Sequence, residues 1–256
     1  MSEWLSLAII VLATCGIVVL LAMVRQRRVG EDDDPSETPD VMEYMTMMIG
    51  VVYAIVLGLA IAGVWEANSA AGAQVQQEAQ ALHEISQQVE VFPEDVREDV
   101  QEAIGTYVAY TVNEEWDHML DHGELTAQGN ELLHGVRTAV NQYEPQTVRE
   151  ATAYQGMFDR LSVAKEGRAG RAESAQSTMP QVVWIGLFTG AVVVIGLVFM
   201  LQIQQTTRQL VIAGLFTALI SFLLYLVWFF DAPYARALDD ATEAFTLLFP
   251  EAGRGS

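Results

Sequence analysis

The sequence predicts an all-α membrane protein with four transmembrane helices in two hairpins and a helical extramembrane bundle between spans two and three. Two observations lead to this prediction. The 256 residues are 52% hydrophobic, yet their formal net charge is −20. Both values fit one chain if charged and apolar residues occupy different segments, and residues 66–180 do hold 20 acids and only 7 bases. The second observation is four long stretches that are nearly free of charge.

These stretches are each about 20 residues long, which is what a helix needs to cross a hydrocarbon core of ~30 Å. The predicted spans are residues 4–24, 41–64, 182–201 and 210–230. Arg25-Gln26-Arg27-Arg28 follows the first span in place of a small-residue cleavage site, so we expect a retained anchor. The resulting segments are a hairpin (1–65), an acidic insert (66–180), a second hairpin (181–230) and an amphipathic tail (231–256).

The insert is predicted to begin as a continuation of span two. No helix breaker follows Trp65, so residues 66–90 should extend that span as one rod. Pro93-Glu94-Asp95 then predicts a new helix, because proline suits a first turn and acids favour the positive end of the helix dipole. This second helix should end at Gly123.

Two further helices are predicted in the insert. Apolar residues at helical spacing mark one over 132–143, closed by Glu144-Pro145. The other runs from about 146 to 177 toward span three, with a kink at Pro180.

The strongly negative net charge argues against nucleic-acid partners and suggests a salt-rich solvent. A chain of net charge −20 repels nucleic-acid phosphates, so no nucleic-acid binding is expected. Lys165 is the only lysine, and a low-lysine, acid-rich surface is typical of proteins that stay soluble in molar salt. We therefore hypothesise a halophilic source.

No motif for catalysis or cofactor binding is present. The sequence has no P-loop, GxSxG, HExxH or CxxC pattern, and no span carries a charged residue near its centre, so neither an enzyme nor a proton relay is expected. His118 and His122 are the best metal candidates, because they share a helical face. They lack a clear third ligand, which favours a solvated acidic helix end and no metal.

Span two carries two stripes with a spacing of four residues. One consists of small residues, and the other is apolar and consists of Val51, Ile55 and Leu59. The small residues are Gly50, Ala54, Gly58 and Ala62. Both stripes could be ordinary helix-packing surfaces. Alternatively, one stripe packs against another helix and the other lines a narrow hydrophobic pore neck.

Several short motifs resemble those of the bestrophin-like family, and together they cover nearly the whole chain. They are Gly50-x-x-Tyr53-Ala54-x-x-Leu57-Gly58, Trp65-Glu66, Glu78-Ala79-x-x-Leu82, Glu114-Glu115-Trp116 and Asp231-Ala232-Pro233-Tyr234. The resemblance implies a homopentameric, chloride-type anion channel in a lipid bilayer, whose partners are inorganic ions and its own copies.

The resemblance also suggests where the pore lies. Val56-Leu57-Gly58 is similar to a segment in the neck of bestrophins, and aligning on it assigns the neck to Val51, Ile55 and Leu59. Bestrophin necks carry bulky aromatic residues where this chain has aliphatic ones. The arginines at 25–28 would place the insert outside, whereas Arg160, Lys165, Arg168 and Arg171 before span three would place it inside, so the distribution of bases does not decide. The family keeps the insert in the cytoplasm, and we expect the same here.

A second interpretation remains open. A helical domain of about 115 residues between two spans is also typical of membrane-anchored sensors or scaffolds without a pore. In that case both stripes of span two serve only packing, and a dimer is expected.

Overall fold

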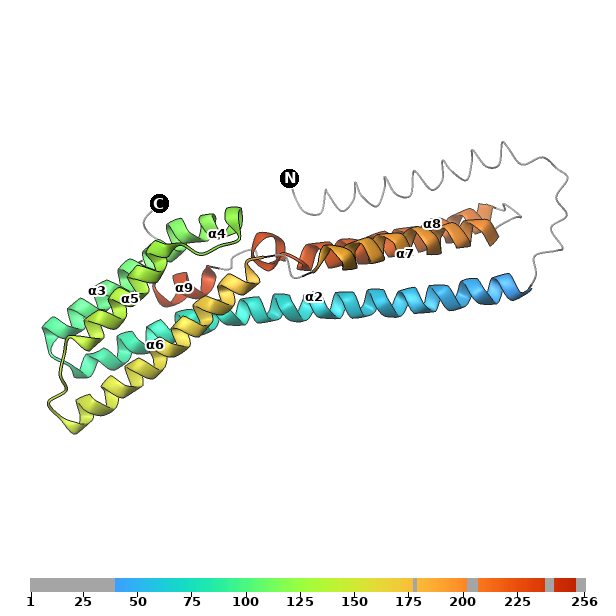
Figure 1. Ribbon diagram of the computed structural model, residues 1–256. Helices are drawn as coiled ribbons and strands as arrows, with labels where there is room; N and C mark the ends of the chain where they lie inside the picture. The colour runs from blue at the N-terminus through green and yellow to red at the C-terminus, as the bar shows by residue number, and fades with distance from the viewer. Residues whose placement is uncertain (1–39, 177–178, 202–206, 238–241, 252–256) are drawn as a thin grey trace. The chain divides into compact units, whose positions relative to one another are not determined.

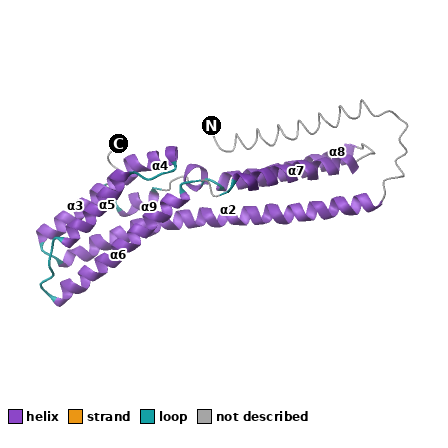
Figure 2. Cartoon of the chain, in the orientation of Figure 1, coloured by secondary structure: helices purple, strands orange, loops and turns teal. Residues whose placement is uncertain are grey.

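The structure is a computed structural model that describes residues 40–176, 179–201, 207–237 and 242–251. The part of the chain so described is helical and contains no strand (Figure 2), which confirms the all-α prediction there. It divides into two compact units: residues 40–65 with 179–229, which we call the membrane unit, and residues 66–178 with 230–251, the extramembrane unit.

Helix α2 (Asp40–Gln88) contributes to both units and contains 49 residues without a break. It passes through Trp65 and Glu66, where one unit ends and the other begins. The prediction that span two continues into the insert as one rod is therefore confirmed (Figure 1).

The membrane unit contains the three described helices that are long and apolar enough to cross a membrane. Besides the first part of α2 they are α7 (Gln181–Leu201) and α8 (Thr207–Phe230). Ala191 and Val194 of α7 pack with Ile220 of α8, and Tyr53 of α2 lies against this small cluster. The remaining predicted span, residues 4–24, lies outside the described residues.

The extramembrane unit is a helical bundle around one apolar core. A 3₁₀ turn (Val89–Val91) leads from α2 into α3. The helices that follow are α3 (Glu94–Tyr110), α4 (Trp116–His122), α5 (Ala127–Asn141), α6 (Val148–Ser174) and α9 (Glu243–Leu248). Helix α3 packs along α5, α5 contacts α6, and α6 contacts the 3₁₀ turn. The core gathers Leu82, Ile104 and Val136 among its buried residues.

Local chemistry explains the start of α5 and the end of α4. The Thr126 hydroxyl accepts a hydrogen bond from the Gly129 backbone N–H at the start of α5, as expected of an N-cap. Gly123 ends α4 in the left-handed conformation (φ 70°), which glycine adopts without steric cost. The predicted helix end at Gly123 is thus confirmed.

Two helix predictions need correction. The second predicted helix is interrupted by a five-residue π-helical segment, Thr111–Glu115, between α3 and α4. The fourth does not run on toward span three, because α6 ends at Ser174 and α7 begins at Gln181. Pro180 directly precedes α7; a proline disfavours helical conformation in the residue before it and cannot donate an intrahelical hydrogen bond, so a helix starts afresh there.

Helix α6 packs closely on α2 because position 167 is glycine. A Cβ atom at Gly167 would lie 2.9 Å from the Glu78 backbone nitrogen and 3.0 Å from the Gln74 carbonyl oxygen. We expect Gly167→Ala to destabilise the extramembrane unit by about 1–3 kcal/mol, since backbone atoms would have to move apart. Hydrogen exchange of α6 amides in the full chain measures this change.

The matched control is Gly105→Ala on α3, where an added Cβ meets no atom within 4 Å. Alanine is a better helix former than glycine, so this variant should be unchanged or more stable by up to about 1 kcal/mol. Equal stability of the two variants would show that α2 and α6 do not approach so closely.

Candidate functional site

Span two uses one face of α2 to pack inside its own chain. Leu57 and Val64 are buried on this face. The Tyr53 hydroxyl donates a hydrogen bond to the Leu187 carbonyl oxygen of α7 at 3.1 Å. Its ring lies beside Gly190, where a Cβ atom would come within 2.6 Å of the ring. The family-motif residue Tyr53 therefore anchors α2 to α7 within the membrane unit, and Leu57 is buried on the same face of α2.

The apolar stripe assigned to a neck lies on a different face. Val51, Ile55 and Leu59 are 55%, 58% and 69% exposed, so the described part of the chain does not cover them. At 100° per residue, the centre of this stripe lies about 180° around α2 from the packed face formed by Tyr53, Leu57 and Val64. The stripe thus points away from the packing of α2 on the described residues.

The small-residue stripe is also open in the single chain. Ala54, Gly58 and Ala62 are exposed, and Gly50 is half-buried. A Cβ atom added at Gly50 or Gly58 would meet nothing within 4 Å. Any helix that packs on this stripe therefore comes from outside the described residues.

The extramembrane unit contains a buried ion-pair cluster, which we define as Glu78, Tyr107, Glu115, Arg168 and Arg171. All five side chains are almost completely inaccessible to solvent. Arg171 binds Glu78 with two hydrogen bonds, from Nε at 3.0 Å and Nη2 at 3.2 Å, and Nη2 also reaches Glu115 at 3.1 Å. Arg168 makes a two-pronged contact with Glu115, including Nη2–Oε1 at 2.7 Å.

A tyrosine completes this cluster. The Tyr107 hydroxyl donates to Glu78 and accepts a hydrogen bond from Arg168 Nη1 at 3.1 Å. Two carboxylates and two guanidiniums balance in charge, and hydrogen bonds connect them to the phenol. The cluster thus fits the rule that buried charges are tolerated when they are paired and hydrogen-bonded.

Four separate elements bring the cluster together. Glu78 lies on α2, Tyr107 on α3, Glu115 in the π-helical segment, and both arginines on α6. Glu115 also accepts hydrogen bonds from the backbone and hydroxyl of Thr126, at 3.1 and 2.8 Å. A π segment shifts the following residues around the helix and is frequent at functional sites, and here it ends at the buried carboxylate.

The environment favours the charged forms of Glu115, Arg168 and Arg171 and the neutral phenol of Tyr107. Burial by itself would raise the pKa of Glu115, but hydrogen bonds from Arg168 and the positive charges of Arg171 and Arg168 outweigh it and lower that pKa to about 2. Burial would lower the pKa of Arg171, yet the charge of Glu78 and its hydrogen bonds with Arg171 raise that pKa instead. Burial, with the nearby Glu78 charge, raises the pKa of Tyr107.

The lowered pKa of Glu115 predicts the acid sensitivity of the extramembrane unit. A carboxylate whose pKa is lower in the folded state than its ordinary 4.5 contributes stability above that value, and the contribution is lost as pH falls toward 2. We therefore expect stability from this group to be constant down to about pH 4.5 and to decline below it. Acid titration followed by hydrogen exchange of α3 and α6 measures the decline.

Glu115→Gln should be less stable at neutral pH and show a shallower acid transition, because its side chain no longer takes up a proton. Glu84→Gln is the control, since Glu84 pairs with Arg160 at a half-exposed position. If Glu115→Gln and the unaltered chain lose stability over the same pH range with the same slope, Glu115 is not the controlling group.

Two further family-motif residues, Trp116 and Tyr234, lie beside this cluster. Trp116 meets Tyr234 edge to face at a centroid distance of 5.5 Å, and the Arg171 guanidinium lies 5.5 Å from the Trp116 ring. The Tyr234 hydroxyl donates to the Ala71 carbonyl oxygen at 3.0 Å. Asp231 and Pro233 are buried beside Tyr234 in the chain, whereas Trp65 and Glu66 are exposed on α2.

The two histidines do not acquire a third ligand in the described structure. His118 and His122 stack at a centroid distance of 4.3 Å, and His122 Nδ1 lies 3.1 Å from the His118 carbonyl oxygen. Among the residues that the structure describes, no group of three His, Cys, Asp or Glu side chains could hold a metal ion. The pair therefore remains a helix-end contact of α4.

Sequence reasoning missed the two arginines of the cluster. Arg168 and Arg171 stood out only as positive charges ahead of span three. A usable signal was present nonetheless, because they are three residues apart on one helical face, and Gly167 and Gly170 adjoin them. Small residues beside charged ones on a helix allow close packing around a buried ion pair.

Comparisons with known proteins identify a family and a fold for this chain. A family model described as a Bestrophin-like domain matches residues 12–239. A bacterial bestrophin homologue from Klebsiella pneumoniae superposes with a TM-score of 0.70 at 13% identity, covering 97% of this chain and 100% of that one. A crystal structure of a membrane protein gives 0.67 at 13% identity, with 99% and 100% covered.

A second structure of the Klebsiella pneumoniae homologue gives a TM-score of 0.60 at 14% identity, with 98% of both chains covered. At such identities the likeness shows the fold alone. No functionally curated protein is significantly similar in sequence. The match of the family model over most of the chain shows that this protein belongs to the bestrophin-like family.

Proposed function

We propose that this protein is an oligomeric, multi-pass membrane channel that passes anions of the chloride type. Its neck would be formed by Val51, Ile55 and Leu59 of α2, repeated around a homopentameric ring, with the small-residue stripe in contact with neighbouring copies. The extramembrane unit would lie in the cytoplasm. Family membership and the fold of bacterial bestrophin homologues support this proposal.

One observation carries it: the face of α2 opposite its anchor on α7 is apolar, and none of the described residues covers it. A helix fixed on one side by Tyr53, Leu57 and Val64 can present the opposite side to an axis. Gly50, Ala54 and Gly58 lie between these two faces around the helix, where a neighbouring helix could approach closely, and Ala62 borders the neck positions. Narrow apolar constrictions of this kind gate pores by wetting and dewetting.

A net charge of −20 does not exclude anions from such a neck. The three neck positions carry no charge. In 1 M salt the Debye length falls to about 3 Å, so carboxylates elsewhere on the chain are largely screened from a permeating ion. Oriented backbone amides can supply local positive potential.

Reconstitution of the full chain tests this function. Native mass spectrometry of protein in lipid nanodiscs gives the number of subunits, and a planar bilayer with a KCl gradient gives the current and its reversal potential. We expect five subunits and a reversal potential close to the chloride equilibrium value.

Two other results would contradict the proposal in different ways. A dimer without current would support the sensor or scaffold interpretation. A ring whose current reverses near the potassium equilibrium value would keep the channel and remove the anion selectivity. Protease added outside intact spheroplasts should leave α6 uncut if the extramembrane unit is cytoplasmic.

A further inference from the structure

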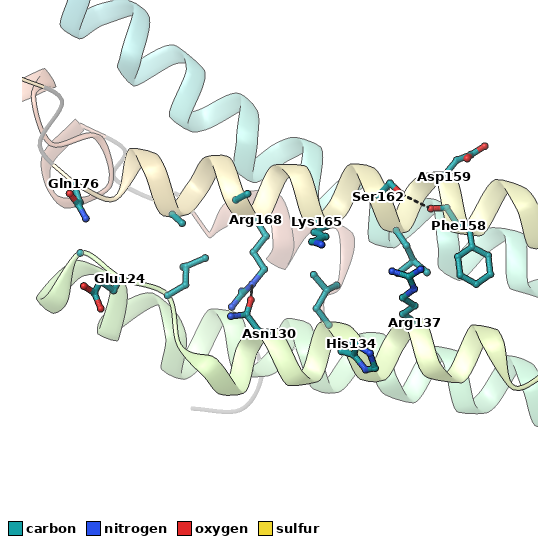
Figure 3. A pocket seen from close by; sticks show the side chains of 16 residues that line it. Glu124, Asn130, His134, Arg137, Phe158, Asp159, Ser162, Lys165, Arg168 and Gln176 are labelled. Carbon is teal, nitrogen blue, oxygen red and sulfur yellow. Dashed lines mark hydrogen bonds between the residues drawn. The ribbon is translucent and has the colours of Figure 1, made fainter.

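One cavity of the extramembrane unit lies between α5 and α6 (Figure 3), and we call it the α5–α6 cavity. Its volume is about 920 Å³, within the range of small-molecule sites. Leu133 of α5 and Leu161 of α6 give it an apolar lining, and Arg168 of the ion-pair cluster also borders it. The cavity therefore has the size and the mixed lining of a ligand pocket.

Cations without an acidic partner gather at this cavity. Residues 66–180 contain only seven bases, and Arg97, Arg160, Arg168 and Arg171 form ion pairs there. The other three, within the described structure, have no carboxylate within ion-pair distance. Two of those three, Arg137 and Lys165, line the α5–α6 cavity, while Arg149 does not. In so acidic a segment, two unneutralised cations beside one cavity favour an anionic occupant.

Arg137 is held in place without using its hydrogen-bond donors. Its guanidinium lies 5.8 Å from the centre of the Phe158 ring on α6, although Arg137 itself is on α5. This cation–π contact reaches across the cavity and leaves the edge of the guanidinium free to bind a planar anion with two hydrogen bonds. Lys165 adds a flexible point charge to the same cavity.

The carboxylates that line the cavity do not neutralise the charges of Arg137 and Lys165. Asp159 and Glu124 are the two carboxylates that border the cavity. Figure 3 shows Asp159 directed away from α5. Glu124 lies near Gln176, at the opposite end of the cavity from Arg137. Neither forms an ion pair with Arg137 or Lys165 in the described structure.

We propose that the α5–α6 cavity binds an amphipathic organic anion. Its apolar body would lie against Leu133, Leu161 and Phe158, and its carboxylate, sulfonate or phosphate group would bind Arg137 and Lys165. The occupant would also lie beside Arg168, whose other contacts hold Glu115 and Tyr107. This binding does not depend on whether the protein conducts ions.

Equilibrium dialysis of the full chain in nanodiscs tests the site, with empty nanodiscs subtracted. The probes are 2-naphthoate, its neutral counterpart 2-naphthylmethanol, and inorganic phosphate. We expect saturable binding of 2-naphthoate, at least tenfold weaker binding of the other two, and weaker binding of 2-naphthoate in 1 M than in 0.1 M KCl, because salt screens the cations.

Variants locate the binding. Arg137→Gln/Lys165→Gln should weaken 2-naphthoate binding at least tenfold, whereas Arg149→Gln, the matched exposed arginine, should leave it unchanged. Circular dichroism and the subunit number confirm that each variant still folds and assembles.

Three results would overturn the proposal. The first is no saturable binding of 2-naphthoate above empty nanodiscs. The second is equal weakening by Arg149→Gln, which would indicate nonspecific charge attraction. The third combines two observations: the unaltered chain does not bind 2-naphthoate, and Arg137→Gln/Lys165→Gln changes the subunit number. Together they would mean that a second copy of the chain covers the cavity.

Discussion

Replacing Arg171 by methionine should reduce the stability of the extramembrane unit by about 3–5 kcal/mol, the cost of removing one partner from a buried ion pair. Arg171 is fully buried and contacts both Glu78 and Glu115. Methionine fills much of the same volume, so the loss measures mainly the uncompensated charge. Hydrogen exchange of amides in α3 and α6 of the full chain reports the free energy of opening.

This loss of stability arises at Glu78, which would lose both hydrogen bonds from Arg171. Without Arg171 its carboxylate keeps only the Tyr107 hydroxyl as a hydrogen-bond donor among side chains, at a position inaccessible to water. Glu115 would still be paired with Arg168. The cost therefore falls on Glu78, and the contact between α2 and α6 should open first.

Two comparisons make the prediction specific. Arg160→Met removes an arginine from the same helix, but its pair with Glu84 is 43% exposed on both sides, so about 0–1 kcal/mol is expected. Glu78→Gln/Arg171→Met removes the unpaired charge as well and should recover about 0.5–3 kcal/mol relative to Arg171→Met. Equal losses for Arg160→Met and Arg171→Met would mean that the cluster is solvated.

The fold could be predicted largely from periodicity and breakers. Pro93 and Gly123 mark ends that the structure confirms, and the absence of a breaker after Trp65 predicts the continuous α2. The π segment at Thr111–Glu115 could not be predicted in this way. Its helical residues have no unusual composition, and the local distortion accompanies the tertiary contacts of Glu115 with Arg168 and Thr126.

The ion-pair cluster shows a different limit of sequence reasoning. Glu78 and Glu115 could be singled out as parts of motifs, but their partners Arg168 and Arg171 lie 53 to 93 residues further along the chain. Charge counting treats all arginines before span three alike. Only the packing of α6 on α2 distinguishes the buried Arg168 and Arg171 from the half-exposed Arg160.

Leu59→Ala should raise the single-channel conductance about tenfold, if shortening this side chain in every subunit lowers the barrier to ion passage by about 1.4 kcal/mol. Leu59 is the most exposed of the three neck positions, at 69%. A wider and less apolar constriction holds water more readily, and a hydrated ion then passes at lower cost. Single-channel recording in planar bilayers measures the change, and Ile55→Ala should act in the same direction.

Leu215→Ala on α8 is the matched control, because it is the same substitution at a similarly exposed position (66%) of another membrane helix. It should leave the conductance unchanged if Leu215 faces lipid. Leu59→Glu adds a test of position, since a ring of carboxylates in a neck favours cations and should move the reversal potential toward the potassium equilibrium value. If Leu59→Glu leaves that potential unchanged while the protein still conducts, the ions do not pass Leu59. This face of α2 must then contact lipid, another subunit or a part of the chain outside the described residues.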